Sequence, residues 1–156
     1  MDNILYFTTI TQQKGGTFNV SIIIVILAFV VIVPLIILTC SIINSMKNTS
    51  LTLTENEIII KSIFYGRKIP LKNILIDGIK QINIEENKEY DISIRTNGIS
   101  VPYFKSGWMR LENGKKALTF ITNKTNVVLI PTKDYLILFS MDKIDKFIEK
   151  IKEIRN

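Results

Sequence analysis

The feature that most constrains this chain is an uncharged apolar run from Val20 to Ile43. A helix of that length reaches about 36 Å at roughly 1.5 Å per residue, and a bilayer's hydrocarbon core is about 30 Å thick. We therefore expect one transmembrane helix over residues 20–43. Pro34 lies inside this run, lacks a backbone N–H and is expected to kink the helix. Proline kinks of this kind are tolerated in transmembrane helices. Because a single span offers no path for a solute, the function is expected in the residues that the span carries.

Two cleaved leaders are alternatives to a stable span. A secretory signal peptide has an apolar core of about 7–15 residues after a positively charged start. Here the apolar run is longer, and Lys14 is the only basic residue before it. A lipoprotein signal would attach lipid to Cys40, but Thr39 stands where a small residue is preferred. The sequence favours an uncleaved anchor over either leader.

The expected organisation has three parts: a short N-terminal tail over 1–19, the transmembrane helix over 20–43, and one domain over 47–156. The last part is close to the commonest size of a single domain. Only Asp2 and Lys14 are charged before Lys47, so the domain carries the whole net charge of +6. This excess suits an anionic membrane face, but the basic residues are spread among acidic ones, as on an ordinary solvated surface. No basic stretch alternates with aromatic residues, so nucleic acid is not an expected partner.

The residues for common catalytic chemistry are missing from the sequence. There is no histidine, and the one cysteine, Cys40, lies in the expected span. The sequence therefore predicts no catalytic residues, no metal site and no cofactor. The acidic residues between Glu85 and Asp91 cluster, but Asn87 and Lys88 among them indicate a polar turn. We expect a protein that is not an enzyme.

From Leu51 onward the chain consists of short β-branched segments separated by turn residues, which predicts a meander of about seven antiparallel strands. Asn97-Gly98 and Asn113-Gly114 are dipeptides typical of tight hairpins. Alternation places Ile92 and Ile94 on the same buried face of one strand. After Ser140 the apolar period changes to three and four residues, which predicts one amphipathic helix packed on the core. Its apolar positions are Ile144, Phe147, Ile148, Ile151 and Ile154.

Seven antiparallel strands followed by a C-terminal helix resemble the pleckstrin-homology (PH) fold, a partly open barrel or sandwich. The segment 51–74 looks like the opening of bacterial PH-like domains, with a strand, a turn glycine and a basic-Ile-Pro step into the next strand. The segment 103–151 is similar to a family of membrane-attached bacterial PH-like proteins. The positions that carry this second resemblance are Gly107, Trp108, Asn113, Gly114, Lys115, Pro131 and Thr132.

The resemblance implies a binding module that recruits a protein or peptide partner, or a lipid headgroup, at the membrane. The alternative is a structural subunit that self-associates as a homo-oligomer or packs in a larger membrane complex. Lys61, Arg67 and Lys68 lie near the region that binds phosphoinositides in eukaryotic PH domains, but they do not reproduce that basic motif, so lipid specificity is not transferred. Tyr103 and Trp108 are candidates for a partner groove, but packing in the fold is the favoured role of these aromatic residues. Strand addition to an open sheet edge is a further route to binding.

Basic residues flank the span almost equally. Lys14 lies on one side, and Lys47 and Lys61 lie on the other. Arg67, Lys68 and Lys72, slightly farther along, tilt the comparison toward a domain on the cytoplasmic side. We expect a single-pass protein of the cell membrane with a cytoplasmic domain.

Overall fold

The structure is a computed structural model that describes residues 16–155. The chain divides into two compact units, Met1–Ser41 and Ile42–Asn156. The predicted tail over 1–19 lies mostly outside the described residues, and the predicted domain bounds stay predictions.

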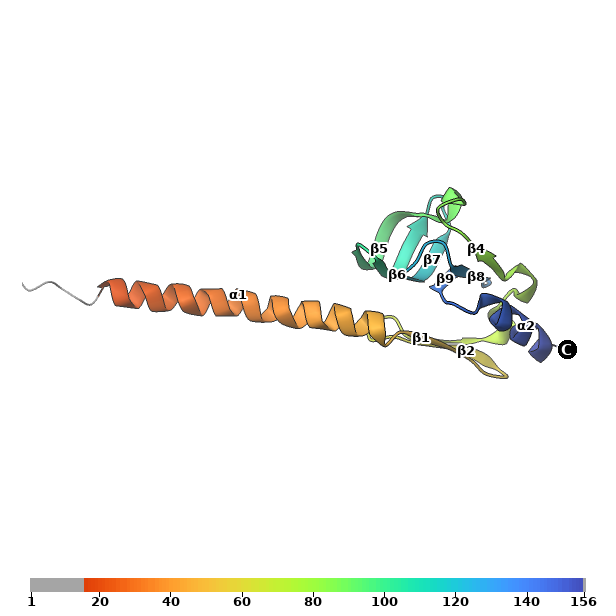
Figure 1. The fold of residues 1–156 in the computed structure, drawn as a ribbon, viewed down its shortest axis with the longest axis horizontal. Coiled ribbons are helices and arrows are strands. Elements are labelled where there is room, and N and C mark those ends of the chain that lie inside the picture. The colour runs from red at the N-terminus through yellow and green to blue at the C-terminus, as the bar shows by residue number, and fades with distance from the viewer. Residues whose placement is uncertain (1–15, 156) are drawn as a thin grey trace, which may run out of the picture. The chain divides into compact units, whose positions relative to one another are not determined.

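The N-terminal helix α1 (Gly16–Lys47) contains the apolar run (Figure 1). Its stretch Asn19–Asn44 is long and apolar enough to cross a membrane, judged by length and composition. Pro34 lies inside it. Thr39 and Ser41 donate their hydroxyls at 2.8 and 2.9 Å to carbonyls one turn earlier, which satisfies these polar groups within the helix. The expectation of a membrane-capable helix is confirmed.

Two sheets and a C-terminal helix make up the second unit (Figure 1). The three-stranded sheet has the order β1-β2-β3, and its strands are β1 (Ser50–Leu53), β2 (Glu57–Lys61) and β3 (Arg67–Pro70). The six-stranded sheet has the order β4-β8-β9-β7-β6-β5. Its strands are β4 (Lys80–Ile82), β5 (Ile92–Val101), β6 (Phe104–Leu111), β7 (Lys116–Ile121), β8 (Val127–Pro131) and β9 (Leu136–Ser140). The chain ends in α2 (Ile144–Arg155), and short 3-10 turns occur at η1 (Leu71–Asn73), η2 (Ile76–Gly78) and η3 (Lys88–Tyr90).

The mainly β fold with a C-terminal helix is confirmed, but the expectation of about seven strands, all antiparallel, needs correction. The described residues contain nine strands, and β7 pairs with β9 in parallel. The chain leaves β7, passes the end of β9 and returns as β8 on the far side. The Ser140 hydroxyl holds this crossing in place: it accepts from the backbone N–H groups of Thr122 and Asn123 at 3.1 and 3.2 Å and donates to the Asn123 carbonyl. Local turn chemistry does not reveal such a crossing.

The predicted hairpin at Asn97-Gly98 is wrong. Strand β5 continues through this dipeptide, and the chain turns between Val101 and Phe104 instead. Gly98 lies opposite Gly107 on β6, and a Cβ on Gly107 would lie 2.7 Å from the Gly98 Cα. The glycines therefore allow a close approach of two strands and do not form a turn. By contrast, Gly114, with φ +78°, lies in the β6–β7 turn, so the second hairpin is confirmed.

Register shifts in β5 also overturn one burial prediction. The pairing of β5 with β6 shifts between Ile92 and Ile94, so the two side chains do not share a face as simple alternation requires. Ile94 is 58% exposed, whereas Ile92 is partly buried against the core.

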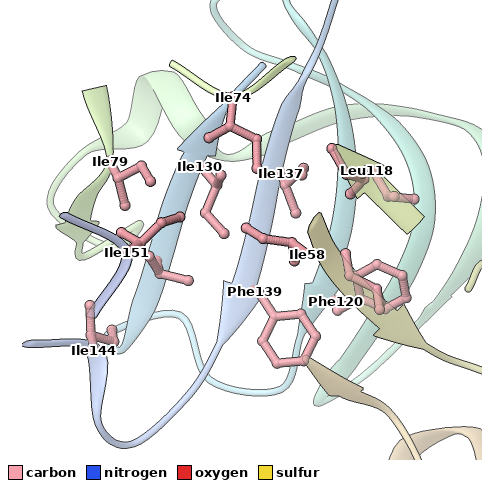
Figure 2. Close-up of a cluster of buried hydrophobic side chains, with 13 residues drawn as sticks. Ile58, Ile74, Ile79, Leu118, Phe120, Ile130, Ile137, Phe139, Ile144 and Ile151 are labelled. Atoms are coloured by element: carbon pink, nitrogen blue, oxygen red, sulfur yellow. The ribbon is translucent and has the colours of Figure 1, made fainter. Parts of the chain in front are cut away.

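Both faces of the six-stranded sheet are covered, because successive side chains of its central strands enter two different cores. The first core lies between the two sheets and α2, and its labelled members are Ile58, Ile74, Ile79, Leu118, Phe120, Ile130, Ile137, Phe139, Ile144 and Ile151 (Figure 2). The second core lies on the opposite face and contains Ile82, Ile84, Leu111, Ala117, Ile121, Val127, Leu129, Leu136 and Leu138. The predicted packing of α2 is confirmed, since Ile144 and Ile151 are buried and Phe147 and Ile148 pack against the same core.

Candidate functional site

Trp108 is the centre of the most distinctive side-chain cluster in the second unit. It projects from β6 toward the first core, where it is partly buried. The Tyr135 ring meets it edge-on, with ring centroids 4.9 Å apart and planes at 78°. Such edge-to-face pairs contribute about 0.5–1.5 kcal/mol beyond the area that they bury. One face of the sheet thus presents two fixed aromatic rings near its margin.

Two cations lie over the indole from different strands. The Arg67 Cζ is 4.9 Å and the Lys116 Nζ is 4.2 Å from the ring centroid of Trp108. Arg67 reaches the ring from the three-stranded sheet: its Cα partner Ile60 is a core residue, so both share the inner face. Cation–π contacts of this kind are worth about 0.5–1 kcal/mol at exposed sites. They restrict where the two charges lie.

Further basic side chains extend this cluster into a surface with two hollows. A hollow of about 460 Å³ is lined by Trp108, Arg110 and Lys116, among others. A second hollow, of about 320 Å³, also includes Lys116 in its lining, together with Tyr135. We call the whole set the Trp108 surface. Its members are Arg67, Trp108, Arg110, Lys115, Lys116, Lys133 and Tyr135.

Within residues 16–155, no carboxylate forms an ion pair with the cations of the Trp108 surface. The ion pairs found within residues 16–155 join Lys68 to Glu57, Lys124 to Asp91, and Lys150 to Glu153. None includes a member of the Trp108 surface. Asp134 is the one acidic residue that lines either hollow in the described part of the chain. The surface can therefore hold an anionic group against aromatic rings.

The five binding residues predicted from sequence do not form one site. The structure brings Arg67 and Trp108 together. Lys61 and Lys68 lie on the outer face of the three-stranded sheet, where the Lys68 ammonium is 3.8 Å from the Glu57 carboxylate. Tyr103 lies in the β5–β6 turn, 87% exposed and with a positive φ of 65°.

Sequence reasoning missed Lys116 and Tyr135. Tyr135 reaches Trp108 because β9 pairs in parallel with β7, which the segment order did not indicate. Lys116 had a usable signal. Lys116 lies two positions before Leu118 on β7. Because side chains two positions apart in a strand share a face, Lys116 lies on the core-facing side at the start of the strand.

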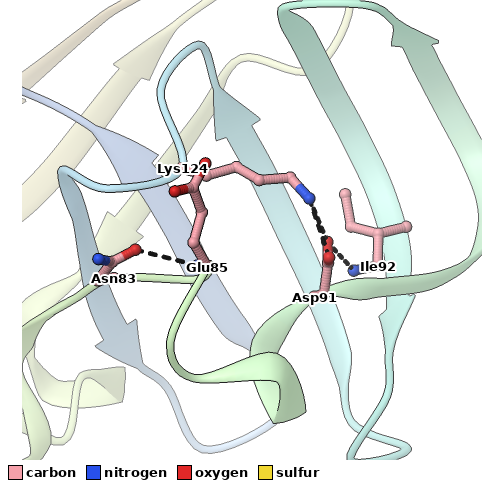
Figure 3. A network of polar contacts seen from close by, with 5 residues as sticks. All are labelled: Asn83, Glu85, Asp91, Ile92 and Lys124. Atoms are coloured by element: carbon pink, nitrogen blue, oxygen red, sulfur yellow. Dashed lines mark hydrogen bonds and ion pairs between the residues drawn. The ribbon is translucent and has the colours of Figure 1, made fainter.

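The acidic segment between β4 and β5 has a structural role (Figure 3). The Lys124 ammonium donates to both Asp91 oxygens at 2.9 and 3.1 Å, and the Ile92 N–H donates to the same carboxylate. Burial raises the pKa of Asp91, but these hydrogen bonds and the charge of Lys124 outweigh it and hold the pKa below its ordinary value of 3.8. The pair ties the start of β5 to the β7–β8 loop. The Asn83 side chain accepts from the Glu85 N–H at 3.0 Å, which folds the preceding turn.

Within residues 16–155, no group of three or more His, Cys, Asp or Glu side chains could hold a metal ion.

Comparison with known proteins identifies the domain. Residues 49–154 match the family of bacterial PH domains. No curated protein and no solved structure matches the chain. The family is one of binding modules that are generally not catalytic. The two sheets, the C-terminal helix and a match over most of the sequence agree, and the chain belongs to the bacterial PH domain family.

Proposed function

We propose that this protein is a membrane-anchored, non-catalytic binding module whose Trp108 surface recruits an acidic segment of a partner protein. The observation that carries the proposal is the group of cations around Trp108 that lack carboxylate partners within the described chain. An exposed charge keeps most of its hydration, so a partner's carboxylate gains about 0.2–1 kcal/mol per ion pair. Several such pairs, arranged around aromatic rings, are needed for useful affinity.

The hollows favour a peptide as the partner. Both hollows include Lys116 in their lining, so an extended segment that passes over Lys116 can place one acidic side chain in each while its apolar groups cover Trp108 and Tyr135. Aromatic and arginine side chains are typical anchors of protein interfaces. A second copy of the chain is an unsuitable occupant of this surface, because the chain has a net charge of +6 and like charges would repel.

Two further observations support a module without catalysis. In the acidic segment, the Asp91 carboxylate is engaged by Lys124 and a backbone N–H, as expected for a structural tie. The family consists of modules that generally bind and do not catalyse. A broad activity screen of the full chain, with and without divalent metals, should show no turnover that depends on Glu85 or Asp91.

The length and apolar composition of α1 support anchoring of the protein in a membrane. We propose that α1 spans the cell membrane and that the domain lies on the cytoplasmic side. The span would hold the Trp108 surface near the bilayer and raise the local concentration of the domain for a membrane-bound partner.

Peptide binding tests the proposal. The full chain is placed in nanodiscs of zwitterionic lipid and titrated with a fluorescein-labelled, glutamate-rich peptide while anisotropy is followed. Lys116→Glu should weaken binding about fivefold, which corresponds to ~1 kcal/mol. The control Lys152→Glu makes the same charge change at an exposed position on α2 and should leave affinity close to that of the unaltered chain. Equal losses of peptide affinity in the two variants would show that the effect comes from net charge alone. They would refute peptide recognition by the Trp108 surface.

The lipid-headgroup alternative gives a different result in the same assay. Titration with a water-soluble, short-chain phosphatidylglycerol replaces the peptide. If Lys116→Glu weakens lipid binding and leaves peptide binding unchanged, the surface recognises a headgroup and the peptide proposal fails.

Self-association through an open sheet edge remains a prediction. β5 is an edge strand of ten residues, but its two register shifts interrupt the row of free backbone groups. Irregularities of this kind protect edges from pairing. A discrete oligomer of the full chain in detergent would favour the assembly role over recruitment.

A further inference from the structure

The β2–β3 turn lies where the chain enters the domain from α1. Ser50, the first residue of β1, is the Cα partner of Lys61, the last residue of β2. One residue outward on each strand, the Thr49 hydroxyl donates to the Ser62 hydroxyl at 3.4 Å. The turn over residues 62–66 is therefore fixed at the end of the three-stranded sheet at which the polypeptide arrives.

This turn exposes large apolar side chains. Ile63 is 52% and Phe64 is 48% exposed. The turn is also tight, since a Cβ on Gly66 would lie 3.0 Å from the carbonyl oxygens of Ile60 and Ser62. A tight turn presents its two apolar side chains in a defined direction.

A second exposed ring lies at the same end of the domain. Tyr103, in the β5–β6 turn, is 87% exposed. Its neighbour Phe104 lines a small hollow of about 100 Å³ together with Thr49, the residue just before β1. We call Ile63, Phe64 and Tyr103 the apolar rim. The other large apolar side chains exposed in the described part of the β domain are Leu75 and Ile94.

We infer that the apolar rim rests on the bilayer surface beside the point where the span leaves it, as a second membrane contact of the same chain. The inference depends on the proposed anchoring by α1 and is independent of the Trp108 surface. Residues 44–49 separate the apolar run from β1. Even fully extended, they reach only about 20 Å at roughly 3.5 Å per residue. The tether therefore keeps the rim close to the membrane interface.

The chemistry of the rim fits a lipid surface. Apolar side chains beside basic ones are typical of segments that lie in the membrane interface, and tyrosine is enriched at that depth. Lys61 and Lys68 lie on the outer face of the sheet next to the turn, and each basic residue near an anionic leaflet contributes about 1 kcal/mol. Because the span already holds the domain in place, a weak contact is sufficient.

Depth-dependent fluorescence quenching tests the inference on the full chain. In a Cys40→Ala background, a single cysteine at Ile63 carries the fluorophore NBD. The chain is reconstituted into phosphatidylcholine vesicles containing phosphatidylglycerol and a doxyl-labelled lipid. NBD at position 63 should shift to the blue and be quenched several-fold more than at the control positions. Flotation with the vesicles, measured separately, reports on the span, so a failure of anchoring is distinguished from a failure of the rim.

Two control positions match the probe. Ile94→Cys replaces an isoleucine whose exposure is similar to that of Ile63. Ile94 lies seven residues before Val101 on β5, so it is about 23 Å from the β5–β6 turn at roughly 3.3 Å per residue. Glu55→Cys places the probe in the β1–β2 turn, at the opposite end of the three-stranded sheet. A Phe64→Ser change with the probe at 63 should weaken the quenching.

Quenching that is equal at the three probe positions would overturn the inference. A blue shift at position 63 without quenching by the doxyl lipid would also overturn it, because the turn would then contact protein and not lipid.

Discussion

Replacing Gly107 with alanine tests the close approach of β5 and β6, the feature that replaced a predicted hairpin. Gly107 has φ +110°, a backbone conformation that side chains with a Cβ rarely adopt. A Cβ there would lie 2.7 Å from the Asn97 carbonyl oxygen and from the Gly98 Cα, and 2.9 Å from the Tyr65 ring carbon Cε2. Two of these neighbours are backbone atoms of the paired strand, so they cannot rotate away.

The expected loss combines two contributions. Holding a residue in a sparsely populated backbone region costs of order 1–3 kcal/mol. Forcing a methyl group into a packed position typically costs a further 1–3 kcal/mol. Because relaxation is shared between the two, we expect Gly107→Ala to lower the free energy of unfolding by about 2–5 kcal/mol. Gly114→Ala is the matched control: its φ of +78° is also positive, but nothing lies within 4 Å of the new Cβ. It should cost only about 1–2 kcal/mol.

Urea unfolding of the full chain in detergent measures both variants. Trp108 is the single tryptophan of the chain and packs against Tyr135, so its emission reports on the unfolding of the domain. The midpoint for Gly107→Ala should fall clearly below that for Gly114→Ala. Equal midpoints would show that the strands have room to separate and that their close approach does not constrain position 107.

Three further predictions follow from burial, charge and orientation. Ile151→Ala should lower the free energy of unfolding by about 2–5 kcal/mol, because the side chain is fully buried, whereas Ile154→Ala should cost less because Ile154 is only partly buried. Asp91→Asn should flatten the acid limb of the stability profile. The lowered pKa means that the ionised carboxylate stabilises the fold above its ordinary pKa of 3.8 and loses this effect as pH falls through the lowered value. Urea midpoints of the variant and of the unaltered chain, measured at several pH values below about 5, test this prediction. An acid limb that is as steep or steeper in Asp91→Asn would contradict it. In Cys40→Ala cells, a cysteine at Lys88 should resist an impermeant thiol reagent until lysis, and labelling of intact cells would place the domain outside.

Local patterns were sufficient for the features that repeat over short distances. The apolar run predicted α1, and the three-and-four spacing from Ile144 to Ile154 predicted α2 with its buried face. The Asn113-Gly114 turn was also predicted correctly, because its positive φ is a property of the turn itself. These predictions succeeded since each depends on neighbours within about one helical turn or one hairpin.

The candidate site was only partly accessible to the same reasoning. Arg67 and Trp108 were named from the sequence, but their contact joins strands of two different sheets. Tyr135 joins them through the parallel pairing of β7 with β9, which a meander of adjacent strands does not produce. Lys61 and Lys68 were named with Arg67 from the resemblance to the phosphoinositide-binding region of PH domains, and Tyr103 was named as an aromatic of a candidate groove. The pleat of β2 and β3 and the β5–β6 turn place these three side chains away from Trp108.

The sequence by itself determined the helix that is long and apolar enough to span a membrane, the mainly β domain and the helix that closes its core, because hydropathy and periodicity act along the chain. The tertiary structure decided which strands meet, and therefore which cations surround Trp108 and which apolar turn lies beside the start of β1. Strand order and register depend on contacts between residues far apart in sequence, where one shifted pair moves every later side chain to the other face. The Gly98–Gly107 pair shows this, since the dipeptide that predicted a turn instead sets the distance between two strands.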